Sequence, residues 1–433
     1  MEVVGQRVKR YDGLAHVAGQ TKFIDDLVVP GTLTVKAFRS PVIKGTIRRI
    51  DITKAEKLPG VAAVITHRDI PHNAYGMIPD QPVLAEEEVR YKGMPIAAVA
   101  AVDEDTAMEA LEQIRVEIEE QDYVLDPIEA MKPGAPKVRP EGNLYIYDGK
   151  PYRQIVFGDV ESGFKKADHI LETEYFHPSL EHAPMETQIS LAVPDANGRL
   201  TLYSVSQAHS VHLQMLCKIL QMPMSKVRLM SGSIGGNFGG KNDIQTDHIT
   251  ALLALKTGRP TKWRWTREEE LLYSTHRGAL YVTMKDGVTK HGQILARRIK
   301  AIRDAGAYNS LNPFLIDKYS FQATGPYFIP NVYIEGYCVY TNRPPASAMR
   351  GFGVTTATFT TEVQMNKIAV MLGKDPWEIR FMNAYHTGDQ MHTRRVLDSV
   401  ALIEAMQALA KKVGVALPDK LNTMTSAARE DRR

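Results

Sequence analysis

A glycine-rich segment is the part of this sequence whose residue types are best suited to chemistry. Five of the nine residues from 232 to 240 are glycine. Because glycine lacks Cβ, such a backbone can approach a bulky ligand closely. A strand pattern precedes the segment at 227–230, and an apolar helix pattern follows at 249–255, with Asn242 or Asp243 placed to cap that helix. The pattern predicts a loop and a helix N-terminus that face an anionic ligand, with a tight turn as the alternative.

A nucleotide-binding P-loop is one interpretation of this segment. Gly235 to Lys241 satisfies G-x-x-x-x-G-K, but Asn242 follows, where a P-loop needs Ser or Thr to bind magnesium. Phe238 also places a bulky side chain in a loop that would have to wrap phosphates. We therefore treat nucleotide binding as a distant alternative.

Composition excludes several other classes. The 433 residues are 44% hydrophobic and 24% charged, which is typical of a globular protein with a sizeable core. The two cysteines, Cys217 and Cys338, are too few for a Cys-ligated iron–sulfur cluster or a four-cysteine zinc site. With 53 basic and 50 acidic residues, the balanced charge gives no indication of nucleic-acid binding. We see no signal-peptide core and no apolar run long enough to span a membrane, so we expect a cytoplasmic protein.

Local patterns predict the elements that must position the loop. The first 125 residues alternate between strand and helix patterns and predict a compact α+β unit. Asp103 is placed to cap a helix whose apolar face uses Ala107, Ala110 and Leu111. Proline and glycine cluster between 126 and 152, which predicts a linker. The other expected elements are strands at 34–39, 95–102 and 114–118, a helix at 400–411, and a loosely ordered polar end at 426–433.

The loop 235–241 resembles the GGGFGGK loop of the xanthine dehydrogenase and aldehyde oxidoreductase family of molybdenum hydroxylases. Other segments match motifs of that family in the same order, and together they cover about residues 10 to 385. These segments are Asp25-Asp26 after residues 19–23, Arg39-Ser40-Pro41, Pro59-Gly60-Val61, Ser206-Gln207, 304–308, Thr341-Asn342, 348–353, and Asp375-Pro376 with Arg380 and Asn383.

The resemblance implies an α+β fold with a small domain followed by a larger one. Residues 1–125 would form an α/β hammerhead-like domain, joined by the linker 126–152 to a first molybdopterin-binding domain of mixed α/β type at 153–385. Residues 386–433 would form a C-terminal helix and tail near a partner subunit.

The resemblance also implies a site for a molybdenum–molybdopterin cofactor, expected in its cytosine dinucleotide form. Gln207 matches the glutamine whose amide bonds near the metal, a role that suits a neutral donor. Gly236, Phe238 and Gly239 match loop residues at the cofactor, where backbone N–H groups face its oxygens. Arg350 matches the arginine of a second cofactor loop. No residue of this chain is expected to bind molybdenum directly.

Three further positions concern the substrate. Phe352 matches an aromatic residue that stacks on a flat heterocycle, with a place in the core as the alternative. Asn242 stands where purine-oxidising members typically carry glutamate, which makes xanthine a doubtful substrate. Lys318 falls about where those members carry arginine, and a basic residue there suits a carboxylate such as that of nicotinate; a surface lysine is equally consistent.

Histidines elsewhere are expected to be structural. His177, His182 and Glu186 look like a metal-binding set, but the family has a similar stretch without a metal, so we expect packing and hydrogen bonding. His209 and His212, three residues apart on a helix pattern, are expected to be partly exposed.

No residue after Asn383 matches the family's second cofactor domain, which supplies further contacts and the glutamate that acts as general base. We expect a naturally split enzyme of the nicotinate dehydrogenase type, in which a second molybdopterin-binding subunit carries that glutamate and separate subunits carry [2Fe–2S] clusters and FAD. The implied activity is hydroxylation of an N-heteroaromatic substrate with oxygen from water. The alternatives are a xanthine or aldehyde oxidoreductase subunit, and a non-catalytic cofactor-binding or scaffold subunit.

Overall fold

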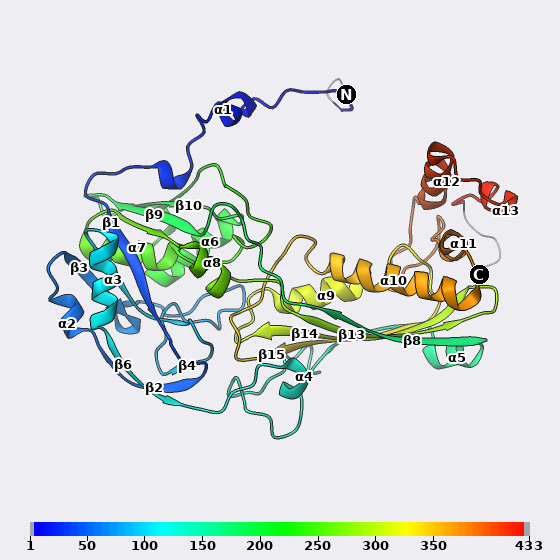
Figure 1. Cartoon of the computed structure of the whole chain (residues 1–433), viewed down its shortest axis with the longest axis horizontal. Coiled ribbons are helices and arrows are strands. Elements are labelled where there is room, and N and C mark those ends of the chain that lie inside the picture. Colours follow the sequence, from blue (N-terminus) through cyan, green and yellow to red (C-terminus); the bar gives the residue numbers. More distant parts are fainter. Residues whose placement is uncertain (1–3, 428–433) are drawn as a thin grey trace. The chain divides into compact units, whose positions relative to one another are not determined.

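The computed structural model describes residues 4–427, and the chain divides into two compact units (Figure 1). The first unit contains 1–122, 181–275 and 342–344, and the second contains 123–180, 276–341 and 345–433. Each unit therefore combines segments that are far apart in the sequence. The mixed helix-and-strand fold class predicted from the sequence is confirmed.

A seven-stranded sheet forms the centre of the first unit. Its β1 strand pairs in parallel with β12 and antiparallel with β5, so strands from the first 125 residues share one sheet with strands from residues 189–264. In spatial order the strands are β11 (Val227–Ser231), β10 (Leu200–Ser204), β9 (Ile189–Pro194), β12 (Thr261–Arg264), β1 (Leu33–Arg39), β5 (Pro95–Ala101) and β3 (Val61–Thr66).

Helices and a small sheet complete this unit. The α3 helix begins as predicted, because the Asp103 side chain accepts a hydrogen bond from the Thr106 amide and Ala107 and Ala110 are buried. The predicted cap of α7 is wrong: the N-cap is Thr246, because residues 242–245 continue the loop. The remaining elements are α1 (Gly13–Val17), η1 (Ile24–Asp26), α2 (Thr53–Glu56), η2 (His67–Asp69), α3 (Glu104–Gln113), α6 (His209–Leu220), η3 (Met224–Lys226), α7 (Asp247–Thr257), α8 (Arg267–Tyr273), and a sheet of β4 (Glu88–Val89), β2 (Gly45–Asp51) and β6 (Arg115–Glu120).

A five-stranded sheet organises the second unit. Helices α9 and α10 run along one side of it and α5 lies on the other (Figure 1). In the core the Arg297 guanidinium donates two hydrogen bonds of 2.8 Å to the Asp286 carboxylate. The elements are β7 (Arg153–Phe157), β15 (Val332–Tyr340), β14 (Ile294–Gly306), β13 (Leu280–Val288) and β8 (His169–His177), with α4 (Pro127–Ala130), α5 (Val160–Lys165), α9 (Asn312–Gln322), α10 (Val354–Leu372), α11 (Pro376–Asn383), α12 (Leu402–Val413) and α13 (Asp419–Asn422).

The segment 126–152, predicted to be a linker, packs onto the second unit. Val138 and Tyr147 are buried, and the Tyr147 hydroxyl donates to the Pro313 carbonyl. Short turns caused by proline and glycine are present there, but they fold against the sheet and do not leave a free connection. The domain boundaries expected from the sequence stay a prediction.

At the C-terminal side, the helix expected at 400–411 is confirmed as α12. Most of the polar end expected at 426–433 lies outside the described residues. Among the described residues, no helix combines the length and apolar character required to cross a membrane.

Candidate functional site

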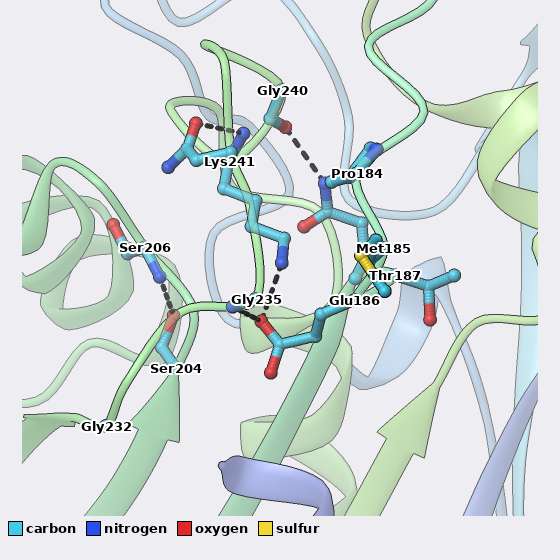
Figure 2. A network of polar contacts seen from close by, with 12 residues as sticks. Pro184, Met185, Glu186, Thr187, Ser204, Ser206, Gly232, Gly235, Gly240 and Lys241 are labelled. Atoms are coloured by element: carbon cyan, nitrogen blue, oxygen red, sulfur yellow. Dashed lines mark hydrogen bonds and ion pairs between the residues drawn. The ribbon is translucent and has the colours of Figure 1, made fainter. Parts of the chain in front are cut away.

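The loop 235–241, called the glycine loop below, is held at both ends by one carboxylate in the first unit. Glu186 Oε2 accepts from the Gly235 amide at 2.9 Å and from Lys241 Nζ at 2.7 Å, as Figure 2 shows. The Glu186 amide in turn donates to the Gly235 carbonyl at 2.9 Å. The Lys241 residue is 1% exposed, so this ion pair lies inside the unit. The two ends of the loop therefore cannot move independently of strand β9, which Glu186 precedes.

Asn237 organises the interior of the glycine loop. Its Oδ1 accepts from the amides of Gly239 at 2.8 Å and Lys241 at 3.3 Å, and its carbonyl accepts from the Gly240 amide at 3.0 Å. The amides of Gly236, Asn237 and Phe238 have no acceptor in the described chain. Three successive N–H groups at the loop tip are thus available to an external oxygen-rich group.

The tip of the glycine loop has an unusual backbone conformation, with positive φ angles. Gly236 and Gly239 have φ of 102° and 105°, and Phe238 has a φ of 55°, which is uncommon for a bulky residue. The Phe238 ring is also exposed. Changes of sign in φ along consecutive residues turn neighbouring N–H groups into a concave anion-binding arrangement. Strain of this kind is concentrated at functional sites and indicates one here.

Close packing explains two of the glycines. A Cβ atom on Gly235 would stand 2.5 Å from Glu186 Cβ, and one on Gly240 would stand 2.9 Å from His182 Nδ1. The Gly240 carbonyl accepts a 2.9 Å hydrogen bond from Gln188 Nε2. These glycines are therefore required by the chain's own packing, whereas Gly236 and Gly239 are required by their φ angles.

Burial shifts the charges beneath the loop. Burial lowers the pKa of Lys241, and the hydrogen bond and charge of Glu186 oppose that shift. Burial likewise raises the pKa of Glu270, whose Oε2 accepts from the Gln188 amide at 2.7 Å. Glu186 thus favours the charged form of Lys241 against the cost of burial.

Gln207 lies beside the end of the glycine loop. The backbone N–H of Gln207 donates to the Lys241 carbonyl at 2.8 Å, and the residue is exposed. Asn242, the next residue of the loop, is half-buried. The first unit therefore brings together five of the predicted site residues, which are Gln207, Gly236, Phe238, Gly239 and Asn242.

His212, expected to be partly exposed, is 2% exposed, and that expectation is wrong. Its Nδ1 lies 2.9 Å from Asp247 Oδ2 and its Nε2 lies 3.0 Å from the Asn242 carbonyl oxygen. Both partners are acceptors, so both ring nitrogens must donate, which requires the imidazolium form. Burial opposes this charge, but the hydrogen bond and charge of Asp247 outweigh burial and raise the pKa of His212.

This histidine therefore holds the backbone that follows the glycine loop. Ser204 Oγ donates to the same Asp247 oxygen at 2.7 Å and so completes the support. One sequence signal points to the burial of His212: it lies four and seven residues before Leu216 and Ile219, on the buried face of α6.

The second unit carries the other predicted loop. Gly351, Phe352 and Gly353 all have positive φ, at 96°, 47° and 94°. Arg350 is exposed, and its backbone carbonyl accepts a hydrogen bond from Arg277 Nη2 at 2.8 Å. Helix α10 begins directly after Gly353, so its N-terminus follows this strained turn.

Lys318 lies next to that turn. A Cβ atom on Gly353 would stand 2.8 Å from the Leu315 carbonyl and 3.5 Å from Lys318 Cβ, so the turn packs against α9. Lys318 is exposed, and Phe352 is half-buried. The second unit therefore brings together Lys318, Arg350 and Phe352. The roles assigned to these residues stay predictions.

The residues His177, His182 and Glu186 do not all lie in the same unit. In the first unit, Glu186 makes the hydrogen bonds described above, and the His182 side chain is fully buried with its Nδ1 3.7 Å from Glu181. In the second unit, the His177 ring packs edge-on against Phe359 at 4.6 Å. The expectation of packing and hydrogen bonding is confirmed for Glu186 and His177. Among the described residues, no three His, Cys, Asp or Glu side chains are grouped to hold a metal ion.

The donors around the glycine loop fit a group with several oxygens, such as a molybdopterin. The tip offers backbone N–H groups, and the Lys241 ammonium at the end of the loop is paired with Glu186. Gln207 adds an exposed amide. This donor set suits oxygens that carry partial negative charge.

Comparison with known families agrees with this chemistry. Residues 145–384 match the molybdopterin cofactor-binding domain, and residues 18–122 match the a/b hammerhead domain of aldehyde oxidase and xanthine dehydrogenase.

Two curated relatives differ in how much of their length is matched. The chain is 40% identical over 377 residues to a probable xanthine dehydrogenase subunit of Bacillus subtilis (strain 168), covering 86% of this chain and 50% of that protein. It is 35% identical over 414 residues to the nicotinate dehydrogenase large molybdopterin subunit of Eubacterium barkeri, covering 95% of this chain and 96% of that protein.

Solved structures share the fold. Aldehyde oxidoreductase from Desulfovibrio gigas superposes with a TM-score of 0.89 at 28% identity, over 94% of this chain and 46% of that one. Quinoline 2-oxidoreductase from Pseudomonas putida 86 superposes with a TM-score of 0.88 at 25% identity, over 95% of this chain and 54% of that one. The chain thus spans about half the length of these structures and of the Bacillus relative. The chain belongs to the aldehyde oxidase and xanthine dehydrogenase family of molybdenum oxidoreductases, and it contains that family's hammerhead and molybdopterin cofactor-binding domains.

Proposed function

We propose that this chain is one of two polypeptides that together hold a molybdenum–molybdopterin cofactor, in an enzyme that hydroxylates an N-heteroaromatic compound such as nicotinate with oxygen from water. The glycine loop carries the proposal. Its tip offers the three unengaged amides of residues 236–238, while the Glu186–Lys241 ion pair holds both of its ends. A loop fixed in this way presents donors whose positions need no rearrangement when the cofactor binds.

The residues proposed for cofactor binding fall into two groups, one in each unit. In the first unit these are Gln207 and the loop positions Gly236, Phe238 and Gly239. Phe238 offers its amide, whereas the Gly239 amide is already bonded to Asn237. In the second unit the exposed Arg350 guanidinium would bind an anionic part of the cofactor, for which we propose the cytosine dinucleotide form. When bound, the cofactor supplies the centre that accepts two electrons from the substrate.

The substrate class rests on Lys318 and Phe352. The Cβ of the exposed Lys318 lies close to Gly353, the residue that follows the half-buried Phe352, and an ammonium and an aromatic ring in one site would suit a flat ring that carries a carboxylate. Considered by itself in the first unit, Asn242 carries a neutral side-chain amide, which suits a ring nitrogen better than a carboxylate would. The 35% identity over 96% of the Eubacterium barkeri nicotinate dehydrogenase subunit supports the same class.

Oxidation of a purine or an aldehyde is the second candidate. The 40% identity to the probable xanthine dehydrogenase subunit of Bacillus subtilis favours it. Substitution of Lys318→Ala separates nicotinate from an uncharged aldehyde, because only a carboxylated substrate pairs with the ammonium. For nicotinate we expect KM to rise about tenfold or more with kcat less affected, whereas kinetics on an uncharged aldehyde should not change.

Partner subunits are part of the proposal, and the family's multi-subunit relatives and the chain's cysteine content support them. A second molybdopterin-binding chain would supply the remaining cofactor contacts and the glutamate that acts as general base. Electrons would then pass to [2Fe–2S] and FAD groups on further subunits. The two cysteines, Cys338 buried and Cys217 half-buried, are too few to ligate such clusters in this chain.

Elemental mass spectrometry of the native complex, purified through a tag on this chain, tests the proposal. We expect about one molybdenum per copy of this chain, with iron in the same complex and turnover of nicotinate in a substrate panel. An intact multi-subunit complex without molybdenum would overturn the catalytic proposal and favour a scaffold role. A complex with molybdenum that oxidises only purines or aldehydes would overturn the substrate class alone.

A further inference from the structure

Residues 4–20 form an arm that carries apolar side chains in solvent. Val4, Val8, Tyr11, Leu14 and Val17 are between 68% and 98% exposed. Helix α1 within the arm has no buried residue. In Figure 1 this dark-blue segment stands away from β1 and β9 of the first unit, to which it belongs.

The chain becomes anchored only after the arm. Ile24 is buried against Ile189, Leu191 and Val205. Lys262 Nζ donates to the Asp25 and Leu27 carbonyls at 3.0 and 2.8 Å, and Arg264 pairs with the Asp25 carboxylate at 2.7 Å. The junction is therefore rigid, and it fixes where the arm leaves the unit.

The arm has local order that the unit does not impose. The Asp12 carboxylate accepts from Arg10 and lies 3.3 Å from His16 Nε2, which closes the turn around α1. Leu14 and Val17 lie three residues apart in α1 and so project from neighbouring positions on the helix, and Tyr11 precedes its N-cap Asp12. A short ordered segment that exposes several apolar side chains in water indicates a protein-binding segment.

We propose that this arm binds the second molybdopterin-binding chain. The inference rests on the proposed function, because it requires a split cofactor-binding unit. This chain covers only 50% of the Bacillus subtilis relative and 52% of the xanthine dehydrogenase molybdenum-binding subunit of Escherichia coli O157:H7. In those relatives the remaining half belongs to the same polypeptide. In a split enzyme that half would be a separate chain, and contacts between the two chains must hold it in place.

The arm is positively charged, which indicates the kind of partner surface that it would bind. Arg7, Lys9 and Arg10 carry three positive charges against the single negative charge of Asp12. We therefore expect the second chain to present an apolar surface with acidic residues at its edge. Electrostatic complementarity of this kind selects the partner and speeds association more than it adds affinity.

A photo-crosslinking residue at Tyr11 in the native complex tests the inference. Tyr11 is suitable because its side chain is almost fully exposed. We expect the crosslinked product to contain the second molybdopterin-binding chain, identified by peptide mass spectrometry. A product with the iron–sulfur subunit, the flavin subunit or a second copy of this chain, or no product at all, would overturn it.

A pair of variants adds a measurement of binding. Leu14→Asp with Val17→Asp should reduce the amount of the second chain that co-purifies by at least tenfold, without changing the melting temperature of this chain alone. The matched control, Gln6→Asp with Gln20→Asp, adds the same charge at exposed polar positions and should leave co-purification unchanged. Equal losses in both variants would show that charge alone, and not the apolar surface, was responsible.

The two proposals fail in different ways. A complex without molybdenum refutes the proposed function, whatever the arm contacts. A complex that contains molybdenum but crosslinks Tyr11 to another subunit refutes only the binding site of the arm.

Discussion

Replacing Glu186 by alanine should destabilise the first unit far more than loss of an ordinary ion pair. The variant leaves the Lys241 ammonium inside the unit, where this residue is 1% exposed, without its counter-ion. At the observed 2.7 Å the pair attracts by roughly 6 kcal/mol at an effective dielectric constant of about 20. Desolvation of both groups offsets most of that attraction in the native protein. Removing Glu186 leaves the desolvation cost of the Lys241 ammonium uncompensated, which should lower the free energy of unfolding by about 3–5 kcal/mol.

The Gly235 amide loses its acceptor in the same variant, which adds about 1 kcal/mol. The double variant Glu186→Ala with Lys241→Met removes the unpaired charge as well. It should therefore recover at least about 2 kcal/mol relative to Glu186→Ala alone.

Tryptophan fluorescence during urea denaturation measures this effect in the correct unit. Of the three tryptophans, Trp263 and Trp265 lie in the first unit, and a Trp377→Phe background removes the signal of the second. The matched control is Glu119→Ala, which breaks the pair with Arg48 on the same unit, where both side chains are 61% exposed. That loss should be below about 1 kcal/mol. Equal losses for Glu186→Ala and Glu119→Ala, or no recovery in the double variant, would refute the reasoning.

Three further predictions concern the same site. His212→Gln should lower the free energy of unfolding by about 1.5–3 kcal/mol through the lost charged hydrogen bonds to Asp247 and the Asn242 carbonyl. Because folding raises the pKa of His212, its contribution is complete below the unfolded value of about 6.5 and is lost as pH rises through the folded pKa. Melting temperatures of wild type and variant should therefore converge at high pH, and a constant difference would contradict this. Phe238→Gly relieves a φ of 55° and should not lower the melting temperature, while the molybdenum content of the complex falls because the freer backbone no longer fixes the amide of residue 238. Gln207→Ala, at an exposed position, should change stability by less than about 0.5 kcal/mol yet reduce turnover about 100-fold with molybdenum retained; a large stability loss would show a structural role instead.

Local sequence determined several elements because their causes are local. The apolar run from residue 95 predicts β5, whose residues after Pro95 are all buried. Asp103 caps α3 because an N-cap needs only a side-chain oxygen within three residues of a free amide. The tight conformation of the glycine loop was also predictable, since a positive φ is a property of one residue and its neighbours.

Other features depended on which distant segments meet. The pairing of β1 with β12 joins residues more than two hundred positions apart, and no local pattern encodes it. The cap of α7 was misplaced because Asn242 and Asp243 have suitable side chains but lie in a loop that ends only at Thr246. The segment 126–152 has the composition of a linker, yet Tyr147 finds a buried partner on the second unit.

The sequence by itself determined the family and the glycine loop, because motifs in order along the chain need no geometry to be recognised. Only the tertiary structure decided how the loop is held. Glu186 reaches Lys241 across 55 residues of chain, and His212 bonds to Asn242 and Asp247 at separations of 30 and 35 residues. A buried charge is stable only beside its partner, and the packing of separate segments into one core determines which partner that is.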